Sequence, residues 1–277
     1  MAVAAPKNKA VLYVAAAAVV LFVFALVHQR KEQSEQMAAA IAGATTKMWP
    51  FKSSGLGDNL PSFYEVARTH GTDKVTAHHY EQMYERYLPA LRHKRIKMLE
   101  IGLGCDMSYG PGASYHVWLE YFPNVDLYFM EYNADCAAMW ADKTTGATIF
   151  TGDQGNPNDL ERFMAENGRD FDIIVDDGGH TMVHQITSLK HLWKAIKPGG
   201  IYFCEDLQTS FSPTWGGGQG AKLAGQDTML TYIHKLMMDM HYIDDQNPRQ
   251  VNFEDVENIV HIDCSKEVCA FLKRRLE

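Results

Sequence analysis

The residues best suited to chemistry follow a short apolar stretch in the middle of the chain. Residues Asp172 to Val175 run into Asp176 and Asp177, two glycines and His180. A run that is apolar on both faces is typical of a central strand in a buried parallel sheet, and the polar turn marks its carboxyl end. Open α/β sheets bind ligands at that end, although a plain turn with an Asp helix cap gives the same pattern.

A second apolar stretch also ends in two acids. Gly200 to Cys204 predicts a strand that ends in Glu205 and Asp206. Burying both carboxylates without partners would cost free energy, so their place after a buried strand favours a functional role over a structural one.

The elements that must position these acids alternate between strands and helices. The predicted strands are Ile96–Ile101, Val125–Tyr132, Ala147–Phe150, Asp172–Val175, Gly200–Cys204, Val256–Asp263 and Val268–Lys273. The predicted helices are Tyr115–Tyr121, Asn133–Ala141, Pro157–Asn167, Val183–Ile196 and Asp227–Met240. This alternation predicts an α/β protein with a Rossmann-like, doubly wound, mostly parallel seven-stranded sheet.

Polar residues also end the first three strands. Glu100, Gly102 and Gly104 form a glycine-containing turn, and Glu131 ends the second strand, where a carboxylate can bind both hydroxyls of a ribose. Asp153 and Gln154 after the third strand could bind an adenine amino group.

Dinucleotide binding expects a third glycine where the chain has Met107, and no Gly-Lys-Ser/Thr phosphate loop occurs. A nucleoside that carries a cationic group, as S-adenosylmethionine does, suits this acidic lining better.

Residues 59–95 predict a small helical N-terminal cap before the sheet. Its helices flank Gly71-Thr72-Asp73-Lys74, and His78 and Tyr80 follow. The turn is either a simple connection or a lid over the cofactor.

The N-terminus predicts a transmembrane helix. Ala10 to Val27 is an uncharged apolar run between basic residues, and a cleaved signal peptide is its main competitor. We therefore expect a tail (1–9), a transmembrane anchor (10–28), a juxtamembrane linker (29–58) and a catalytic domain (59–277). Within that domain, 96–207 forms the cofactor-binding core and 208–277 contains a lid loop, a helix and closing strands.

Charge and cysteine content bear on partners and compartment. The net charge of −8 argues against a nucleic-acid partner. No Asn-x-Ser/Thr acceptor occurs, and Cys105, Cys136 and Cys204 lie in or beside core elements, so a cytosolic catalytic domain is expected. Cys264 and Cys269 flank a hairpin, and their pairing would reverse that argument.

Several motifs together resemble one enzyme family. Leu99–Gly104 resembles the first motif of class I S-adenosylmethionine-dependent methyltransferases, and Ile196–Gly200 resembles their loop before the fifth strand. Gly71–Lys74 with His78 and Tyr80, Gly152–Gln154, Asp176–His180 and Glu205–Thr209 resemble the macrocin/mycinamicin type, which are metal-dependent sugar O-methyltransferases of natural products. The chain departs from that family in two places. The family has a glycine-rich segment after the first motif, where this chain has Cys105–Gly112. The predicted N-terminal anchor is also not typical of the family.

The resemblance implies roles for particular residues. The metal ligands would be Asp177, Glu205 and Asp206, and His180 would be the general base. Neighbouring fourth and fifth strands would bring these carboxylates together, and an all-oxygen set suits Mg²⁺ or Mn²⁺ better than zinc. The cofactor-binding set implied by the motifs comprises Glu100, Gly102, Gly104, Glu131, Asp153, Gln154, Lys74, His78, Tyr80 and Asp176. For Asp176 a cap or turn role is the alternative, because adjacent strand residues point to opposite faces.

The sequence therefore predicts a membrane-anchored O-methyltransferase that uses S-adenosylmethionine and a divalent metal. Its acceptor would be a hydroxyl of a glycosylated or polyhydroxylated small molecule. A degenerate methyltransferase fold that serves as a membrane scaffold, and a hydroxylase with related motifs, are the alternatives.

Overall fold

The computed structural model describes residues 60–219, 223, 226–241 and 258–275. The predicted tail, anchor and linker lie outside these residues. Within the described part of the chain, no helix is both long enough and apolar enough to span a bilayer.

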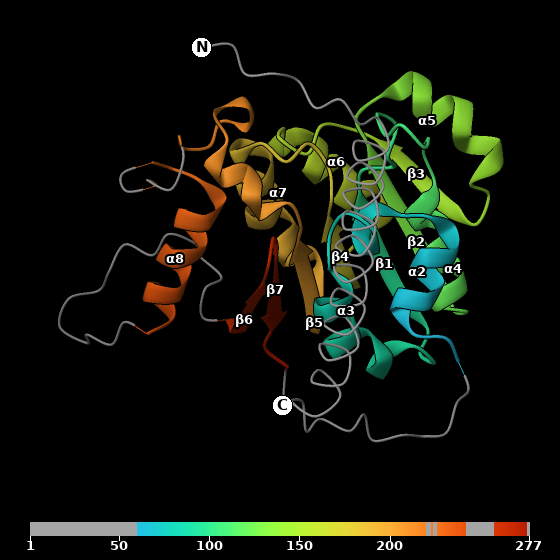
Figure 1. The fold of residues 1–277 in the computed structure, drawn as a ribbon, viewed down its shortest axis with the longest axis horizontal. Coiled ribbons are helices and arrows are strands. Elements are labelled where there is room, and N and C mark those ends of the chain that lie inside the picture. Colours follow the sequence, from blue (N-terminus) through green and yellow to red (C-terminus); the bar gives the residue numbers. More distant parts are fainter. Residues whose placement is uncertain (1–59, 220–222, 224–225, 242–257, 276–277) are drawn as a thin grey trace, which may run out of the picture. The chain divides into compact units, whose positions relative to one another are not determined.

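Seven strands form one sheet, as the alternation of strands and helices predicted (Figure 1). They are β1 (Ile96–Ile101), β2 (Val125–Glu131), β3 (Ala147–Thr151), β4 (Phe171–Asp176), β5 (Ile196–Cys204), β6 (Ile259–Ser265) and β7 (Val268–Lys273). Their order is β3-β2-β1-β4-β5-β7-β6, in which the first five strands pair in parallel and β7 pairs antiparallel with β5 and β6. The reversal of strand order between β1 and β4 is the switch point at which such sheets bind ligands.

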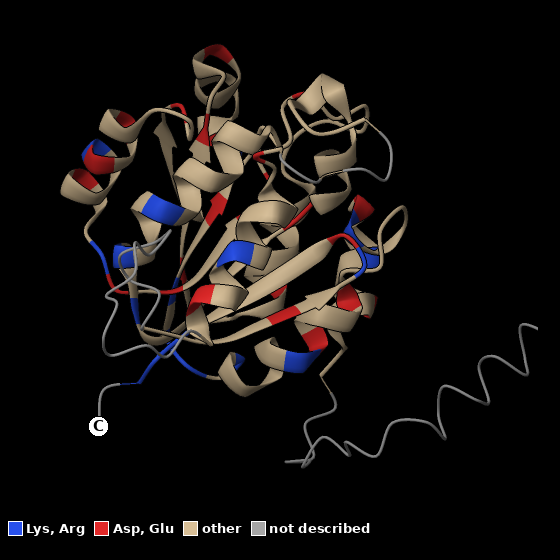
Figure 2. Ribbon diagram, turned by 90° about the vertical axis from the view of Figure 1, so that its left-hand side faces the viewer, with Lys and Arg blue, Asp and Glu red and all other residues tan. Residues whose placement is uncertain are grey.

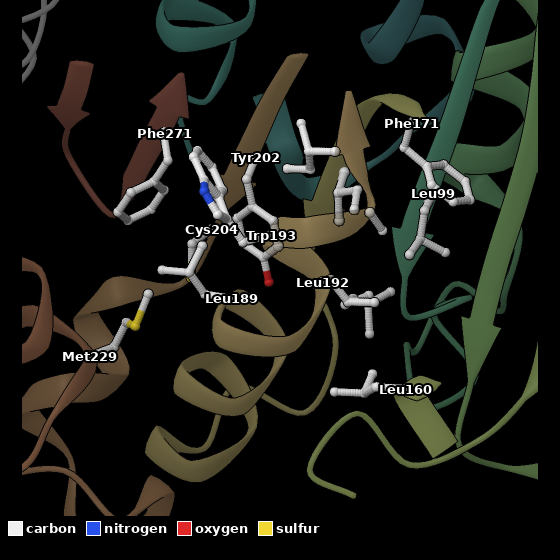
Figure 3. Packing of buried hydrophobic residues seen from close by; sticks show 14 of the residues in the cluster. Leu99, Leu160, Phe171, Leu189, Leu192, Trp193, Tyr202, Cys204, Met229 and Phe271 are labelled. Carbon is white, nitrogen blue, oxygen red and sulfur yellow. The ribbon is translucent and has the colours of Figure 1, made fainter. Parts of the chain in front are cut away.

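Successive residues of the central strands face opposite sides of the sheet, so each strand contributes to two cores. In β4, Ile173 and Val175 pack on one side and Ile174 on the other. Figure 3 shows the second side, where Tyr202 and Cys204 of β5 lie with Leu189 and other helix residues. Burial on both faces explains why these strands read as continuous apolar runs.

Helices cover both faces of the sheet. Three of them, α2 (Phe63–His70), α3 (Glu81–Tyr87) and α4 (Ala113–Tyr121), contribute to one core, and α6 (Pro157–Asn167), α7 (Met182–Leu192) and α8 (Met229–Met240) contribute to the other. Helix α5 (Ala134–Trp140) follows β2. Figure 2 shows Lys and Arg scattered among Asp and Glu over the described ribbon rather than gathered on one face.

Some predicted boundaries differ from the structure. Strand β5 begins at Ile196 rather than Gly200, because the Lys197-Pro198-Gly199 segment already continues the strand, and α7 ends at Leu192 rather than Ile196. A short 3-10 turn, Trp193–Ala195, separates the two. The start of the sixth predicted strand, 256–257, lies outside the described residues.

The prediction for Cys105 and Cys136 is wrong, whereas the pairing of Cys264 with Cys269, which the sequence left open, does occur. Cys105 forms a disulfide with Cys136, and Cys264 forms one with Cys269, while Cys204 is free and buried. Sequence spacing did not reveal the first pair, because Cys105 lies in the turn after β1 and Cys136 in the first turn of α5, after β2. The cysteine content therefore no longer supports a cytosolic catalytic domain, since disulfides are typical of oxidising compartments.

Candidate active site

One cavity lies at the carboxyl ends of the parallel strands. Its volume is about 1100 Å³, and its walls come from the turns after β1 to β5 together with residues of the cap. Nine of the predicted site residues line it: Gly102, Gly104, Glu131, Asp153, Gln154, His78, Asp177, His180 and Asp206. The other five, Lys74, Tyr80, Glu100, Asp176 and Glu205, are almost fully buried behind its wall. The predicted residues therefore form a lining layer and a supporting layer.

Glu131 is held by the backbone on one side of the cavity. It accepts hydrogen bonds from the backbone N–H groups of Leu103, at 3.0 Å, and Asn133, at 2.8 Å. The turn after β1 approaches β4 so closely that a Cβ on Gly102 would lie 2.3 Å from the Asp177 carbonyl oxygen. This half of the cavity, which we call the cofactor half, is thus built mainly from backbone groups.

Gln154 is a structural link as well as a lining residue. Its Nε2 donates to Asp176 Oδ1 and to Ser188 Oγ, both at 2.8 Å, and its Oε1 accepts from Gly179 N at 2.6 Å. Tyr202 donates a further hydrogen bond to Asp176, at 2.8 Å. Asp176 therefore supports the turn that carries Asp177 and His180, which matches the structural alternative for this residue.

A second half of the cavity gathers Asp177, His180 and Asp206. One ligand atom from each lies within 4.8 Å of the others, which is compatible with a bound cation. His180 Nδ1 is buried without a hydrogen-bond partner, 3.7 Å from Asp206 Oδ2. We call this group of three residues the metal half.

Glu205 lies behind the metal half rather than within it. Its two carboxylate oxygens accept from the Tyr84 hydroxyl and, at 2.5 Å, from Lys74 Nζ. Lys74 Nζ also lies 2.5 Å from Asp177 Oδ2 and 3.2 Å from Glu100 Oε1. A single buried ammonium group thus joins the ends of β1, β4 and β5.

Burial and Lys74 set the charge states of these carboxyls. Burial acts to raise the pKa of Asp177, but the charges of Lys74 and His180 outweigh it and hold that pKa below its ordinary value. For Glu205, burial prevails over Lys74 and raises the pKa well above the ordinary value. Burial also raises the pKa of Glu100, against the opposing effect of Lys74. Asp177 is therefore the carboxylate kept ionised at the cavity wall.

The cap completes the metal half. Tyr80 donates a hydrogen bond to Asp206 Oδ1 at 3.2 Å and accepts one from the Asp206 N–H at 3.1 Å. His78 stacks on Tyr80, with ring centroids 4.8 Å apart, and its Nδ1 lies 2.8 Å from Glu267. Tyr80 of the cap therefore fixes Asp206, whereas His78 lines the cavity.

Two candidate residues adopt an uncommon backbone conformation. His180 has a φ of 51° and Asp206 has a φ of 56°, both in the left-handed region. Such conformations cost free energy in residues other than glycine, and they cluster at functional sites.

The sequence reasoning missed part of the lining. Gln208, Thr209, Ser212 and Trp215 also line the cavity, and the rings of Trp215 and His180 are 5.7 Å apart. Trp215 belongs to the predicted lid loop, and this segment is held by backbone hydrogen bonds from Trp215 and Gly217 to the Ser212 carbonyl. The motif Glu205–Thr209 pointed towards this loop, but spacing alone did not place Trp215.

The residues present fit a divalent metal and a nucleoside cofactor. Asp177, Asp206 and the unpartnered His180 Nδ1 offer oxygen and nitrogen ligands around a common space. Glu131 faces the same cavity with a carboxylate suited to ribose hydroxyls. His184 also lines the cavity, but its Nε2 lies 3.7 Å from Asp153, away from the metal group.

Comparisons with known proteins agree with the motifs, although no family model matches the chain. The chain is 32% identical over 179 residues to the 8-demethyl-8-(2-methoxy-alpha-L-rhamnosyl)-tetracenomycin-C 3'-O-methyltransferase of Streptomyces olivaceus, covering 64% of this chain and 44% of the relative. It is 31% identical over 167 residues to the mycinamicin VI 2''-O-methyltransferase of Micromonospora griseorubida, covering 59% of this chain and 40% of the relative.

A solved structure shows the same fold. The MycE methyltransferase of the mycinamycin biosynthetic pathway, in complex with Mg, SAH and mycinamycin VI, matches with a TM-score of 0.68 and 25% sequence identity, over 78% of this chain and 54% of that one. The chain thus spans about half the length of the relatives that it matches. In both sequence and fold, this chain is similar to the macrocin/mycinamicin-type sugar O-methyltransferases.

Proposed function

We propose that this chain is an O-methyltransferase that transfers a methyl group from S-adenosylmethionine to a hydroxyl of a glycosylated small molecule, with the help of Mg²⁺ or Mn²⁺. The observation that carries this proposal is the single cavity that joins Glu131 on one side to Asp177, His180 and Asp206 on the other. The relatives named above are O-methyltransferases of glycosylated compounds, and the MycE structure contains Mg and SAH.

Each half of the cavity has a distinct task in this proposal. When bound, S-adenosylmethionine supplies the methyl group, and the divalent metal lowers the pKa of the acceptor hydroxyl. Glu131 holds the ribose and Asp153 faces the adenine end. Gly102 and Gly104 let the backbone approach the cofactor, and Asp177 and Asp206 hold the metal. His180, the third residue of the metal half, accepts the proton of the hydroxyl in this proposal rather than holding the metal.

Glu205 has two possible places in the metal site. The family pattern makes it a ligand, whereas here it bonds Lys74 and Tyr84. In this proposal, Glu205 binds the metal after the metal displaces the Lys74 ammonium group from the Glu205 carboxylate.

The N-terminal anchor remains part of the proposal. Residues 10–28 are apolar enough and long enough to span a membrane as a helix. The two disulfides favour an oxidising compartment for the catalytic domain over the cytosol predicted from the sequence. Protease protection of the domain in intact membranes distinguishes the two orientations.

The proposed function is tested by ligand-dependent heat stability. S-adenosylmethionine should raise the melting temperature of the purified chain, and Mg²⁺ should raise it further, because each ligand binds the folded state. No shift with either ligand would favour the scaffold alternative. Mass spectrometry of metabolites from cells with and without the chain, grown with a ¹³C-methyl label, identifies the acceptor.

A further inference from the structure

The loop after Gly104 is joined covalently to the start of α5. Cys105, the first residue after the glycine turn, lines the cavity. Its disulfide partner is Cys136, 31 residues later, in the first turn of α5, and their Cα atoms are 6.2 Å apart. The bond therefore connects the turns that follow β1 and β2.

Both turns belong to the cofactor half. Glu131 lies between them, since it accepts hydrogen bonds from Leu103 N and Asn133 N. Asn133 in turn caps α5 by accepting a hydrogen bond from Cys136 N at 3.0 Å. The disulfide thus closes a frame around the carboxylate that faces the ribose in the proposed function.

Beyond the disulfide, the backbone hydrogen bonds of this loop are local. Met107 N donates to the Gly104 carbonyl and Gly112 N to the Leu103 carbonyl, each at 3.1 Å. The Gly112 backbone also passes close to α5, since a Cβ added to Gly112 would lie 3.6 Å from the Trp140 ring. The loop is therefore largely folded on itself, with a further hydrogen bond from Tyr109 to Asp73 of the cap, and the disulfide ties it to the opposite wall.

The geometry points to a role for this bond in cofactor binding: we propose that the Cys105–Cys136 disulfide positions the glycine loop against the cofactor, so that cofactor affinity depends on its oxidation. A loop already held in its bound conformation loses less conformational entropy when the ligand binds. This inference rests on the proposed function, because it concerns the same cofactor site.

Reduction of the bond has a defined chemistry. A thiolate of a dithiol reductant attacks one sulfur, the Cys105–Cys136 bond breaks, and the second thiol then closes a cyclic disulfide in the reductant. The chain gains two thiols, and the dithiol loses two electrons and two protons. The loop is then held only by its noncovalent contacts.

The second disulfide supplies a matched control. Cys264 and Cys269 pair between β6 and β7, at the far edge of the sheet, and neither residue lines the cavity. The double variant Cys264→Ser/Cys269→Ser retains Cys105–Cys136 as its remaining disulfide, with Cys204 buried and free.

The test measures two affinities of this double variant before and after treatment with dithiothreitol. S-adenosylhomocysteine reports on the cofactor half and Mn²⁺ on the metal half, both by isothermal titration. We expect the dissociation constant of S-adenosylhomocysteine to rise roughly tenfold on reduction, as for a loop that must be ordered by the ligand. The dissociation constant of Mn²⁺ should change by less than about twofold. A general loosening of the fold would weaken the binding of both ligands.

The variant Cys105→Ser/Cys136→Ser should bind S-adenosylhomocysteine as weakly as the reduced protein does and should not respond to dithiothreitol. If this variant does not fold, the titration of the reduced Cys264→Ser/Cys269→Ser protein still decides the question. Unchanged S-adenosylhomocysteine affinity after verified reduction, or equal weakening of both ligands, would overturn the inference. Absence of S-adenosylhomocysteine binding in every form would instead refute the proposed function.

Discussion

The two halves of the cavity satisfy their carboxylates in different ways. In the cofactor half, Glu131 is held by backbone N–H groups that lie within a few residues of β1 and β2. In the metal half, Asp177 is held by Lys74, which lies 103 residues earlier in the chain, and Asp206 by Tyr80, 126 residues earlier. The first half depends on local turns, and the second depends on the docking of the cap. Changes to the cap should therefore weaken metal binding more than cofactor binding.

The largest effect is expected when the metal half loses its ionised carboxylate. Asp177→Asn should abolish metal-dependent turnover. Loss of a hydrogen-bond partner of a metal ligand already lowers metal affinity or activity about 10–100-fold, and loss of the ligand itself should cost more. Turnover is measured as release of S-adenosylhomocysteine with the acceptor identified from the metabolite comparison. Retained Mg²⁺-dependent turnover in this variant would remove Asp177 from the metal site.

His180 is the next most sensitive position. His180→Ala should slow turnover by roughly 10²–10⁴ if this histidine is the general base. The matched control is His184→Ala, since His184 lines the same cavity but lies near Asp153. Equal rates for the two variants across the pH range would exclude His180 from proton transfer.

Removal of the buried ammonium group should affect stability. Lys74→Met leaves Asp177, Glu205 and Glu100 without their shared countercharge, and breaking such a buried pair costs about 3–5 kcal/mol. Lys97→Met is the control, because Lys97 Nζ donates to the Asn167 carbonyl and its loss strands no carboxylate. Urea unfolding of both variants without metal gives the comparison, and equal losses would show that Lys74 does not neutralise this cluster.

The smallest effect is expected from a pH-dependent change in stability. The pKa of Glu205 is raised in the folded state, so its contribution to stability is complete below the unfolded value of about 4.5 and is lost as pH rises through the folded value. The pKa of Asp177 is lowered, so its contribution is present above its unfolded value and lost as pH falls through the folded one. Glu205→Gln should therefore gain stability relative to the unmodified, metal-free chain as pH rises above about 4.5. A constant difference over this range would contradict the raised pKa.

The contrast between the halves also explains what the sequence could predict. The sheet and the cofactor half follow from local signals, because apolar runs end in turns whose glycines and acids lie close together in the chain. The partners of Lys74 could not be predicted, since they come from three strands and the motif suggested only a lid or a cofactor contact. Gly104 predicted the cofactor turn. The spacing of Cys105 and Cys136 did not indicate that a disulfide links this turn to α5.

The contacts of the Glu205 carboxylate could not be predicted from the sequence either. The sequence placed it correctly at the end of β5, beside Asp206. Its side chain nevertheless faces Lys74 and Tyr84 in the supporting layer. Which way a side chain turns at a strand end depends on the partners that the cap supplies, and those partners are distant in sequence.

The separation of the two halves is tested most directly by titrating two variants with two ligands. S-adenosylhomocysteine and Mn²⁺ are each titrated into Glu131→Ala and Asp177→Asn by isothermal calorimetry. The account predicts that Glu131→Ala weakens S-adenosylhomocysteine by at least about tenfold and retains Mn²⁺, whereas Asp177→Asn loses Mn²⁺ and retains S-adenosylhomocysteine. Loss of both ligands in either folded variant, or loss of S-adenosylhomocysteine alone in Asp177→Asn, would contradict it.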